Sequence, residues 1–210
     1  MSRPVVALLA LLLAAPAASA RNPDAKHTPH SAHHHNGLFM RLAAGIGFAR
    51  AGQSSSGSEL VLSGAGGSAS LAFGGIIAPN LALNVDLFGV SAVGPKVELD
   101  GVDQGDANNT TMSLAAVGVG VTYYFMPINL YVAASVGPAV GRLETRISDM
   151  VFRDDSDIGL GVNAMVGKEW WVGREWAIGL AGQLVFATLP GDNADINVLG
   201  GGVLFSATWN

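Results

Sequence analysis

The chain has 210 residues, of which half are apolar and only 13% are charged, and its formal net charge is −5. This apolar composition excludes a highly charged disordered chain, and the acidic balance offers no basic surface for nucleic acid. The sequence contains no cysteine, which excludes disulfide bonds, thiolate chemistry and a lipidated N-terminal cysteine.

Residues 1 to 20 have the pattern of a secretory signal peptide. Arg3 precedes an apolar run from Val5 to Ala15, and small residues from Ala18 to Ala20 form a cleavage site. The alternative is a transmembrane helix, which needs about twenty apolar residues, more than this run supplies. We therefore expect the chain to be exported.

Residues 21 to 37, RNPDAKHTPHSAHHHNG, contain prolines and all five histidines without apolar periodicity. This composition is typical of a flexible linker, here a periplasmic one. Closely spaced imidazoles can also bind a transition metal. The sequence leaves two interpretations open, a plain spacer and a metal site. The metal candidates are His27, His30, His33, His34 and His35.

From Leu38 onward the apolar pattern has a period of two, which predicts one all-β domain over residues 38 to 210. Large apolar residues alternate with Gly, Ala, Ser and Asn, as in LALNVDLFG at 81 to 89. We expect eight strands, at about 38–50, 66–77, 81–93, 111–125, 130–143, 157–169, 175–187 and 196–209.

The expected connections alternate between short and long. Tight turns are predicted at 77–80, 126–129 and 170–174, and long polar connections at 51–65, 94–110, 144–156 and 188–195. Most acidic residues fall in the long connections. This arrangement is typical of an eight-stranded antiparallel up-and-down transmembrane β-barrel.

All Tyr and Trp residues cluster near the tight turns and the C-terminus, which an even strand count brings to the same end. Aromatic residues concentrate where hydrocarbon meets water, so we predict an interfacial aromatic belt. The predicted belt residues are Tyr123, Tyr124, Tyr131, Trp170, Trp171, Trp176 and Trp209.

A soluble periplasmic lipocalin-like barrel, with its large apolar side chains turned inward around a ligand, is the structural alternative. Its exterior would then be the Gly, Ala, Ser and Asn face, which is far less charged than a soluble surface requires. The pattern therefore favours an apolar face turned outward into lipid.

The chain from about residue 38 to 210 resembles the small eight-stranded outer-membrane proteins of the OmpA, OmpX and OmpW type. The residues that carry the resemblance are the hairpins GVGVTYYFMPINLYVAASVG and GKEWWVGREWAIGLAG and the terminal VLFSATW. Such proteins commonly end on an aromatic residue, whereas here Asn210 follows Trp209. The resemblance implies a location in the Gram-negative outer membrane. It also implies contact with lipid, lipopolysaccharide and the barrel-insertion machinery.

Three charged residues, Arg41, Asp86 and Glu169, share the inward-facing parity of their strands. Because an unpaired buried charge is costly, we expect them to form an ion-pair network in the lumen. Eight strands leave an interior just wide enough for side chains. The inward glycines, such as Gly118 and Gly161, leave room for waters or a narrow path.

The domain from 38 to 210 contains neither His nor Cys, so it lacks the usual general base of a hydrolase. We expect no enzymatic activity and no cofactor. The leading hypothesis is a structural or surface-interaction role in the cell envelope, with a surface ligand as partner. The alternatives are a narrow channel or carrier for small or hydrophobic solutes, and the soluble ligand-binding barrel.

Overall fold

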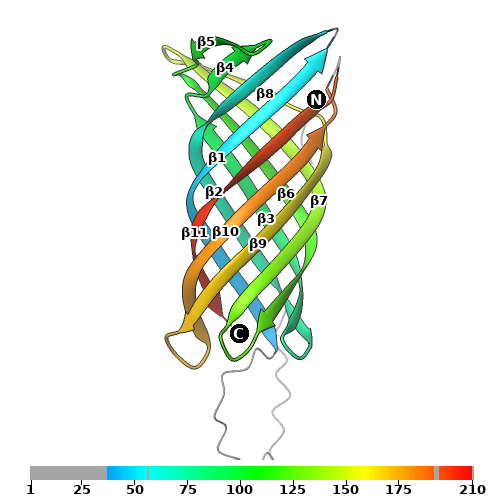
Figure 1. The fold of residues 1–210 in the computed structure, drawn as a ribbon, viewed down its shortest axis with the longest axis vertical. Coiled ribbons are helices and arrows are strands. Elements are labelled where there is room, and N and C mark those ends of the chain that lie inside the picture. The colour runs from blue at the N-terminus through cyan, green and yellow to red at the C-terminus, as the bar shows by residue number, and fades with distance from the viewer. Residues whose placement is uncertain (1–36, 56, 192–193, 210) are drawn as a thin grey trace, which may run out of the picture. The chain divides into compact units, whose positions relative to one another are not determined.

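The computed structural model describes residues 37–55, 57–191 and 194–209. Within them, eleven antiparallel strands form one sheet (Figure 1). The predicted signal peptide at 1–20 and the five histidines of the predicted linker lie outside the described residues. In the described ranges no helix is long and apolar enough to cross a membrane.

Eight long strands make the ring, and three short strands extend it at one end. The ring strands are β1 (Leu38–Ser55), β2 (Ser58–Ala78), β3 (Leu81–Val93), β6 (Thr110–Phe125), β7 (Leu130–Ile147), β9 (Gly159–Trp171), β10 (Trp176–Leu189) and β11 (Ile196–Trp209). The short strands are β4 (Lys96–Leu99), β5 (Val102–Asp106) and β8 (Met150–Asp155).

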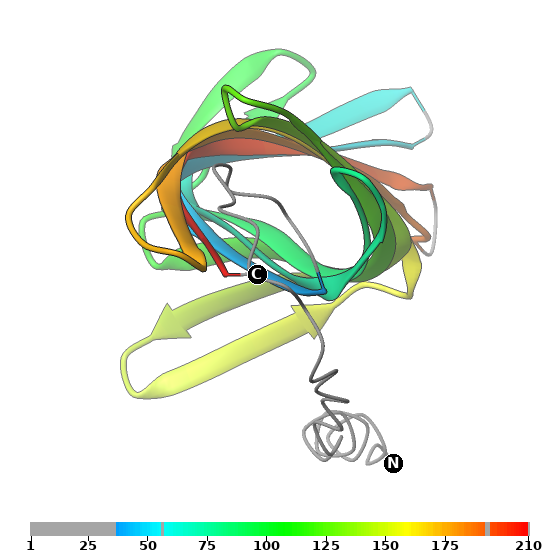
Figure 2. The ribbon, with the colours of Figure 1, turned by 90° about the horizontal axis from the view of Figure 1, so that it is seen from below.

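The sheet closes because β1 pairs with both β2 and β11. The β1–β11 register runs from Met40 opposite Trp209 to Gln53 opposite Ile196, so the last strand is paired along its whole length. Seen along its long axis, the sheet is a closed ring (Figure 2). The predicted eight-stranded antiparallel barrel is confirmed.

Three of the four predicted long connections are not loops. β1 and β2 continue as strands through most of 51–65, and their register runs as far as Ser55 opposite Ser58. β3 and β4 pair with successive parts of the same edge of β2, since Ser68 pairs with Val90 of β3 and Ser63 pairs with Lys96 of β4. In the same way, β9 and β8 pair with successive parts of the same edge of β7. The prediction of polar loops at 51–65, 94–110 and 144–156 was wrong because polar side chains interrupt the apolar pattern while the backbone pairing continues.

The tips of these extended hairpins adopt the left-handed backbone that tight turns require. Asp100 and Gly101 have φ values of 51° and 76°, the pair of positive angles that a two-residue type I′ turn needs. Asn80 and Asn129 have φ values of 62° and 51° in two of the short turns at the other end. We call the two ends of the barrel the hairpin end and the short-turn end.

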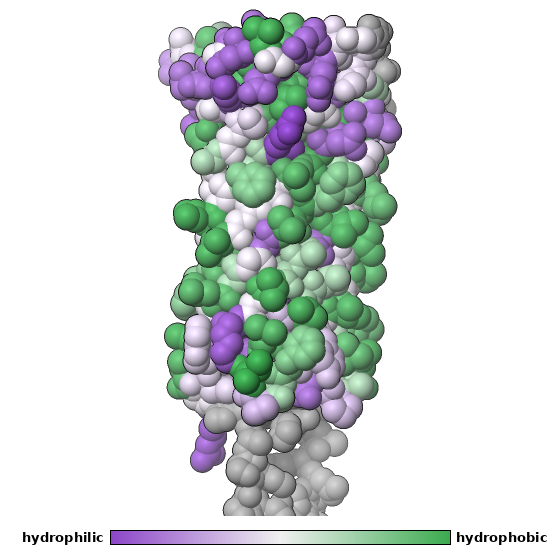
Figure 3. All heavy atoms as spheres, viewed as in Figure 1, coloured by the Kyte–Doolittle hydropathy of each residue, from purple (hydrophilic) through white to green (hydrophobic). Residues whose placement is uncertain are grey.

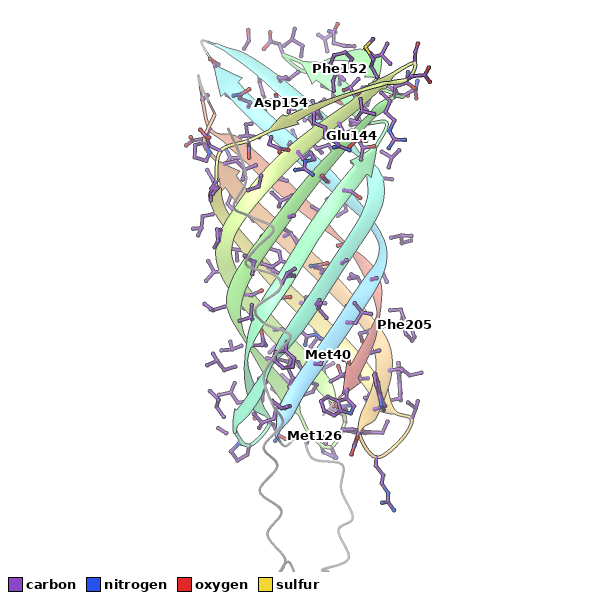
Figure 4. The ribbon with its side chains drawn as sticks, turned by 180° about the vertical axis from the view of Figure 1, so that it is seen from behind. Met40, Met126, Glu144, Phe152, Asp154 and Phe205 are labelled. Atoms are coloured by element: carbon purple, nitrogen blue, oxygen red, sulfur yellow. The ribbon has the colours of Figure 1, made fainter. Side chains whose placement is uncertain are left out.

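The predicted orientation of the wall is confirmed. Large apolar side chains cover the outside, among them Ile46, Val119 and Val203, whereas the buried polar and charged side chains of the strands, such as Asp86 and Asn163, face the interior. Phe205 points away from the barrel in Figure 4. On the face drawn in Figure 3, apolar side chains cover the middle of the wall and hydrophilic ones gather at the hairpin end. The soluble alternative, with its large apolar face turned inward, is therefore wrong for this fold.

A matched pair of valines tests whether this wall lies in lipid. Val119 in the middle of β6 and Val102 at the start of β5 have similar exposed fractions, 64% and 60%, but they lie at different heights. We expect Val119→Arg to lower the free energy of unfolding by about 2–4 kcal/mol and Val102→Arg by less than about 1 kcal/mol, because only Val119 lies in hydrocarbon. Guanidinium titration in lipid vesicles measures both, and equal effects would contradict the membrane orientation.

Candidate functional site

The interior of the barrel is the place where the polar and charged side chains converge, and its contents change along its height. Near the short-turn end, Tyr124 and Tyr131 are completely buried, with ring centroids 5.6 Å apart. Phe39 packs edge-on against Tyr124 at 6.2 Å. These three rings come from β1, β6 and β7 and pack together inside the barrel at this end.

Arg41 is buried beside these rings. Its guanidinium carbon lies 4.4 Å from the centroid of Tyr131, a cation–π contact, and its Nη1 lies 3.4 Å from the Thr122 hydroxyl, to which it donates. The Glu169 carboxylate, also fully buried, accepts hydrogen bonds from the hydroxyls of Ser206 at 3.0 Å and Thr208 at 2.7 Å.

Asp86 lies further along the interior, at the centre of a hydrogen-bonded cluster. Its carboxylate accepts hydrogen bonds from Ser70 at 2.7 Å, Ser135 at 2.6 Å and Asn163 at 2.9 Å. The donors come from β2, β7 and β9, so the cluster bridges opposite sides of the barrel. Hydrogen bonds to a charged group are the stronger kind, and they compensate for burial of this carboxylate.

The cluster continues through Asn163 to Gln183 on β10. The Gln183 amide donates to Asn163 Oδ1 at 2.9 Å, and its oxygen accepts a 2.6 Å hydrogen bond from Ser68. A polar layer therefore crosses the interior above the aromatic residues.

The structure places Arg41, Asp86 and Glu169 in the interior, as their parity predicts. It does not give Asp86 the expected ion pair. No cation among the described residues lies within 4.0 Å of its carboxylate, and its hydrogen bonds to neutral groups take that place. The predicted site residues did not include Ser70, Ser135, Asn163 and Gln183, although the inward parity and polarity of these side chains marked them.

Toward the hairpin end the interior becomes apolar. Buried Phe88, Val90, Leu114, Val185 and Val198 belong to one hydrophobic cluster there. This layer lies beyond the polar cluster, so the barrel contains aromatic, polar and aliphatic layers in succession.

Side chains pack closely against several inward glycines. A Cβ on Gly167 would lie 2.5 Å from the Tyr131 ring, one on Gly200 would lie 2.7 Å from Val90, and one on Gly161 would lie 2.9 Å from Ala139. The space that each glycine provides is filled by a neighbouring side chain. The narrow path through the interior stays a prediction.

A cavity of about 480 Å³ opens at the hairpin end, and we call it the mouth pocket. Its floor is apolar and continuous with the aliphatic layer, and its rim is polar. The floor includes Ala49, Ala51, Leu62, Leu114, Leu189 and Val198, and the rim includes Arg142, Asp154, Asp155, Ser156 and Asp157.

The rim belongs to the β7–β8 hairpin and the residues that follow it, and this hairpin projects sideways beyond the ring (Figure 2). Arg142 donates to both carboxylate oxygens of Asp155, at 2.6 and 3.0 Å, which lowers the pKa of Asp155. Glu144 accepts hydrogen bonds from Arg153 and Arg146, and these lower its pKa. Figure 4 shows Glu144 and Asp154 together at the end of the barrel opposite Met126.

The predicted belt residues divide between the two faces of the wall. Tyr124 and Tyr131 lie inside the barrel, so their assignment to an outward belt was wrong, and Trp171 shares the inward parity of Glu169. The alternation places Tyr124 with Thr122 on the inward face. The outward members are Tyr123, Trp170, Trp176 and Trp209.

The candidate metal residues His27, His30, His33, His34 and His35 all lie outside the described residues. Among the residues that are described, no group of three or more His, Cys, Asp or Glu side chains is placed to hold a metal ion.

Comparison with known proteins identifies the fold. No protein-family model and no curated protein sequence matches the chain. The chain is similar to the crystal structure of Neisserial surface protein A, with 18% sequence identity, a TM-score of 0.51, and coverage of 83% of this chain and 97% of that chain. It is also similar to outer membrane protein OprG from Pseudomonas aeruginosa, with 13% identity, a TM-score of 0.47, and coverage of 84% and 98%.

A third similar structure is the outer membrane protease OmpT from Escherichia coli, with 10% identity, a TM-score of 0.48, and coverage of 82% and 96%. The fold is that of the small outer-membrane β-barrel proteins, as the sequence resemblance implies. The closed ring and its apolar outer wall agree with a location in the outer membrane, because only a closed barrel satisfies the backbone groups of strands in lipid.

Two glycines test the packing of the interior. Gly167→Ala places a methyl group against the Tyr131 ring, whereas at Gly182 the nearest atom to a new Cβ is 4.0 Å away. We expect Gly167→Ala to lower the free energy of unfolding by about 1–3 kcal/mol, since overpacking forces the ring to move. Gly182→Ala is the matched control. Denaturant titration in vesicles compares them, and a tolerated Gly167→Ala would show that the space beside Tyr131 is open.

The polar cluster is tested by Asp86→Asn, which keeps the size of the side chain and removes the charge. We expect a loss of about 1–3 kcal/mol in the free energy of unfolding, because the three donors lose a charged acceptor. Asp106→Asn, at an exposed position of β5, removes the same charge and should change stability by less than about 0.5 kcal/mol. Equal effects of the two substitutions would contradict the structural role of the cluster.

Proposed function

We propose that this chain is a non-enzymatic outer-membrane barrel with a structural or surface-interaction role in the cell envelope. The observation that carries the proposal is the layered packing of the interior. Successive aromatic, polar and aliphatic layers occupy it between the short-turn end and the mouth pocket. Such an interior supports a packed anchor rather than a conducting pore.

The absence of histidine from residues 38 to 210, the usual general base of a hydrolase, supports the non-enzymatic part of the proposal. All five histidines lie between residues 27 and 35, and the chain has no cysteine. The buried carboxylate of Asp86 already accepts hydrogen bonds from Ser70, Ser135 and Asn163. The two serine hydroxyls and the Asn163 amide therefore act as donors to a structural carboxylate, and the cluster is enclosed within the barrel.

In this proposal the short-turn end faces the periplasm and the hairpin end faces the outside. Residues 1–20 direct export, and residues 21–37 form the periplasmic linker, where the histidines provide the candidate metal ligands. Tyr123, Trp170, Trp176 and Trp209 form the periplasmic interface belt. Lipid and lipopolysaccharide contact the wall, the insertion machinery assembles it, and the mouth binds a surface ligand.

The aromatic side chains near Trp176 are held by polar contacts that suit an interface. Trp209 Nε1 donates to Glu175 at 3.2 Å, and the Lys168 ammonium lies 5.5 Å from the centroid of the Trp170 ring. An amphipathic ring with one hydrated polar group is the kind of side chain favoured where hydrocarbon meets water.

Planar-bilayer recording tests the proposal against the channel alternative. We expect the purified barrel to insert without discrete, reproducible openings, since packed aromatic, polar and aliphatic layers cross its interior. A general porin inserted under the same conditions is the positive control. Heat-modifiable gel migration checks that the barrel is folded, and single-channel openings from folded protein would overturn the proposed non-conducting role.

A further inference from the structure

The mouth pocket combines two surfaces, a buried aliphatic floor and an acidic rim. Its volume of about 480 Å³ falls within the range of small-molecule sites, roughly 300–1,000 Å³. Transfer of a hydrocarbon chain into an apolar site is favourable by about 0.8 kcal/mol for each methylene group buried. The floor therefore provides the driving force for binding an alkyl chain.

The rim carries an excess of negative charge. Arg142 is the rim cation, and it is engaged by both carboxylate oxygens of Asp155. Asp154 and Asp157 also line the pocket, and no ion-pair partner lies within 4.0 Å of either among the described residues. Carboxylates at the edge of a concave site attract a cation and disfavour an anion.

The two surfaces meet on the β7–β8 hairpin. Leu143 and Asp154 are directly opposite each other in the β7–β8 register and both line the pocket, so an apolar group and a carboxylate stand side by side. The next pairs on the same face are Thr145 with Phe152 and Ile147 with Met150. Figure 4 shows Phe152 at the hairpin end with Asp154, so the apolar surface continues outward from the pocket.

We propose that the mouth pocket binds a single-chain amphiphile with a cationic head group. The alkyl chain occupies the floor beside Leu62 and Leu143, and the head group lies against Asp154 and Asp157. This inference rests on the proposed function in one respect, that the hairpin end faces the outside, and it names the ligand class of the proposed surface interaction. The ligand binds and leaves through the mouth, because the aliphatic layer closes the floor.

Isothermal titration calorimetry tests the proposal on the full barrel in lipid nanodiscs, with empty nanodiscs subtracted. The probes are octyltrimethylammonium, octanesulfonate and tetramethylammonium. We expect octyltrimethylammonium to bind at one site per chain and octanesulfonate at least tenfold more weakly. Tetramethylammonium, the head group alone, should give no measurable binding. Equal affinity for the two octyl probes, or binding of the head group alone, would overturn the proposal.

Charge substitutions distinguish the effect of the rim carboxylates on binding from the effect of the chain's overall negative charge. The double substitution Asp154→Asn with Asp157→Asn should weaken octyltrimethylammonium binding by roughly fivefold for each carboxylate, which is the size of a screened charge–charge contact near 4 Å. It should not weaken the binding of octanesulfonate. Asp106→Asn with Asp149→Asn removes two exposed carboxylates that do not line the pocket. This control pair should change affinity less than twofold, and an equal effect of the two pairs would contradict a role for the rim.

Substitutions that fill the pocket test the floor. Leu62→Trp and Leu143→Trp each place a larger ring among the lining residues, and each should reduce octyltrimethylammonium binding at least tenfold. Val102→Trp, at an exposed position of β5, is the control and should bind like the parent. Heat-modifiable migration verifies folding of every variant. Unchanged binding in both folded pocket variants would refute the site, whereas single-channel conductance would refute only the non-conducting role.

Discussion

The pairing of β1 with β11 is the constraint on which the rest of the structure depends. Strands in hydrocarbon have no water to satisfy their backbone N–H and C=O groups, and an open edge would leave one row unpaired. The register from Met40 opposite Trp209 to Gln53 opposite Ile196 removes that edge. Closure also creates an inside and an outside, so one alternating pattern separates the lipid-facing side chains from the packed ones.

The interior consists of three layers with different side chains. Tyr124, Tyr131 and Phe39 fill the short-turn end, the cluster around Asp86 joins strands across the middle, and aliphatic side chains close the other end. Beyond the aliphatic layer, at the hairpin end, the mouth pocket forms. It therefore lies where the strands continue as polar extensions.

Local pattern predicted the strands better than their ends. Apolar alternation stops near Arg50, and the structure continues β1 to Ser55 because paired strands above the membrane have no need of an apolar face. Asp100 and Gly101 lie inside the predicted loop at 94–110, and in the structure they form the tip of the β4–β5 hairpin. Proximity to a tight turn suggested a belt role for Tyr124, although the alternation with Tyr123 already assigned it to the interior.

By itself the sequence determined the closed barrel, its eight ring strands and the face that points outward, since these follow from a period of two and from the scarcity of charge. It also placed Arg41, Asp86 and Glu169 inside. Only the tertiary structure decided which inward side chains meet. Ser135 and Asn163 reach Asp86 across 49 and 77 residues of sequence, because curvature and strand stagger bring them to one height, and no local periodicity records that stagger.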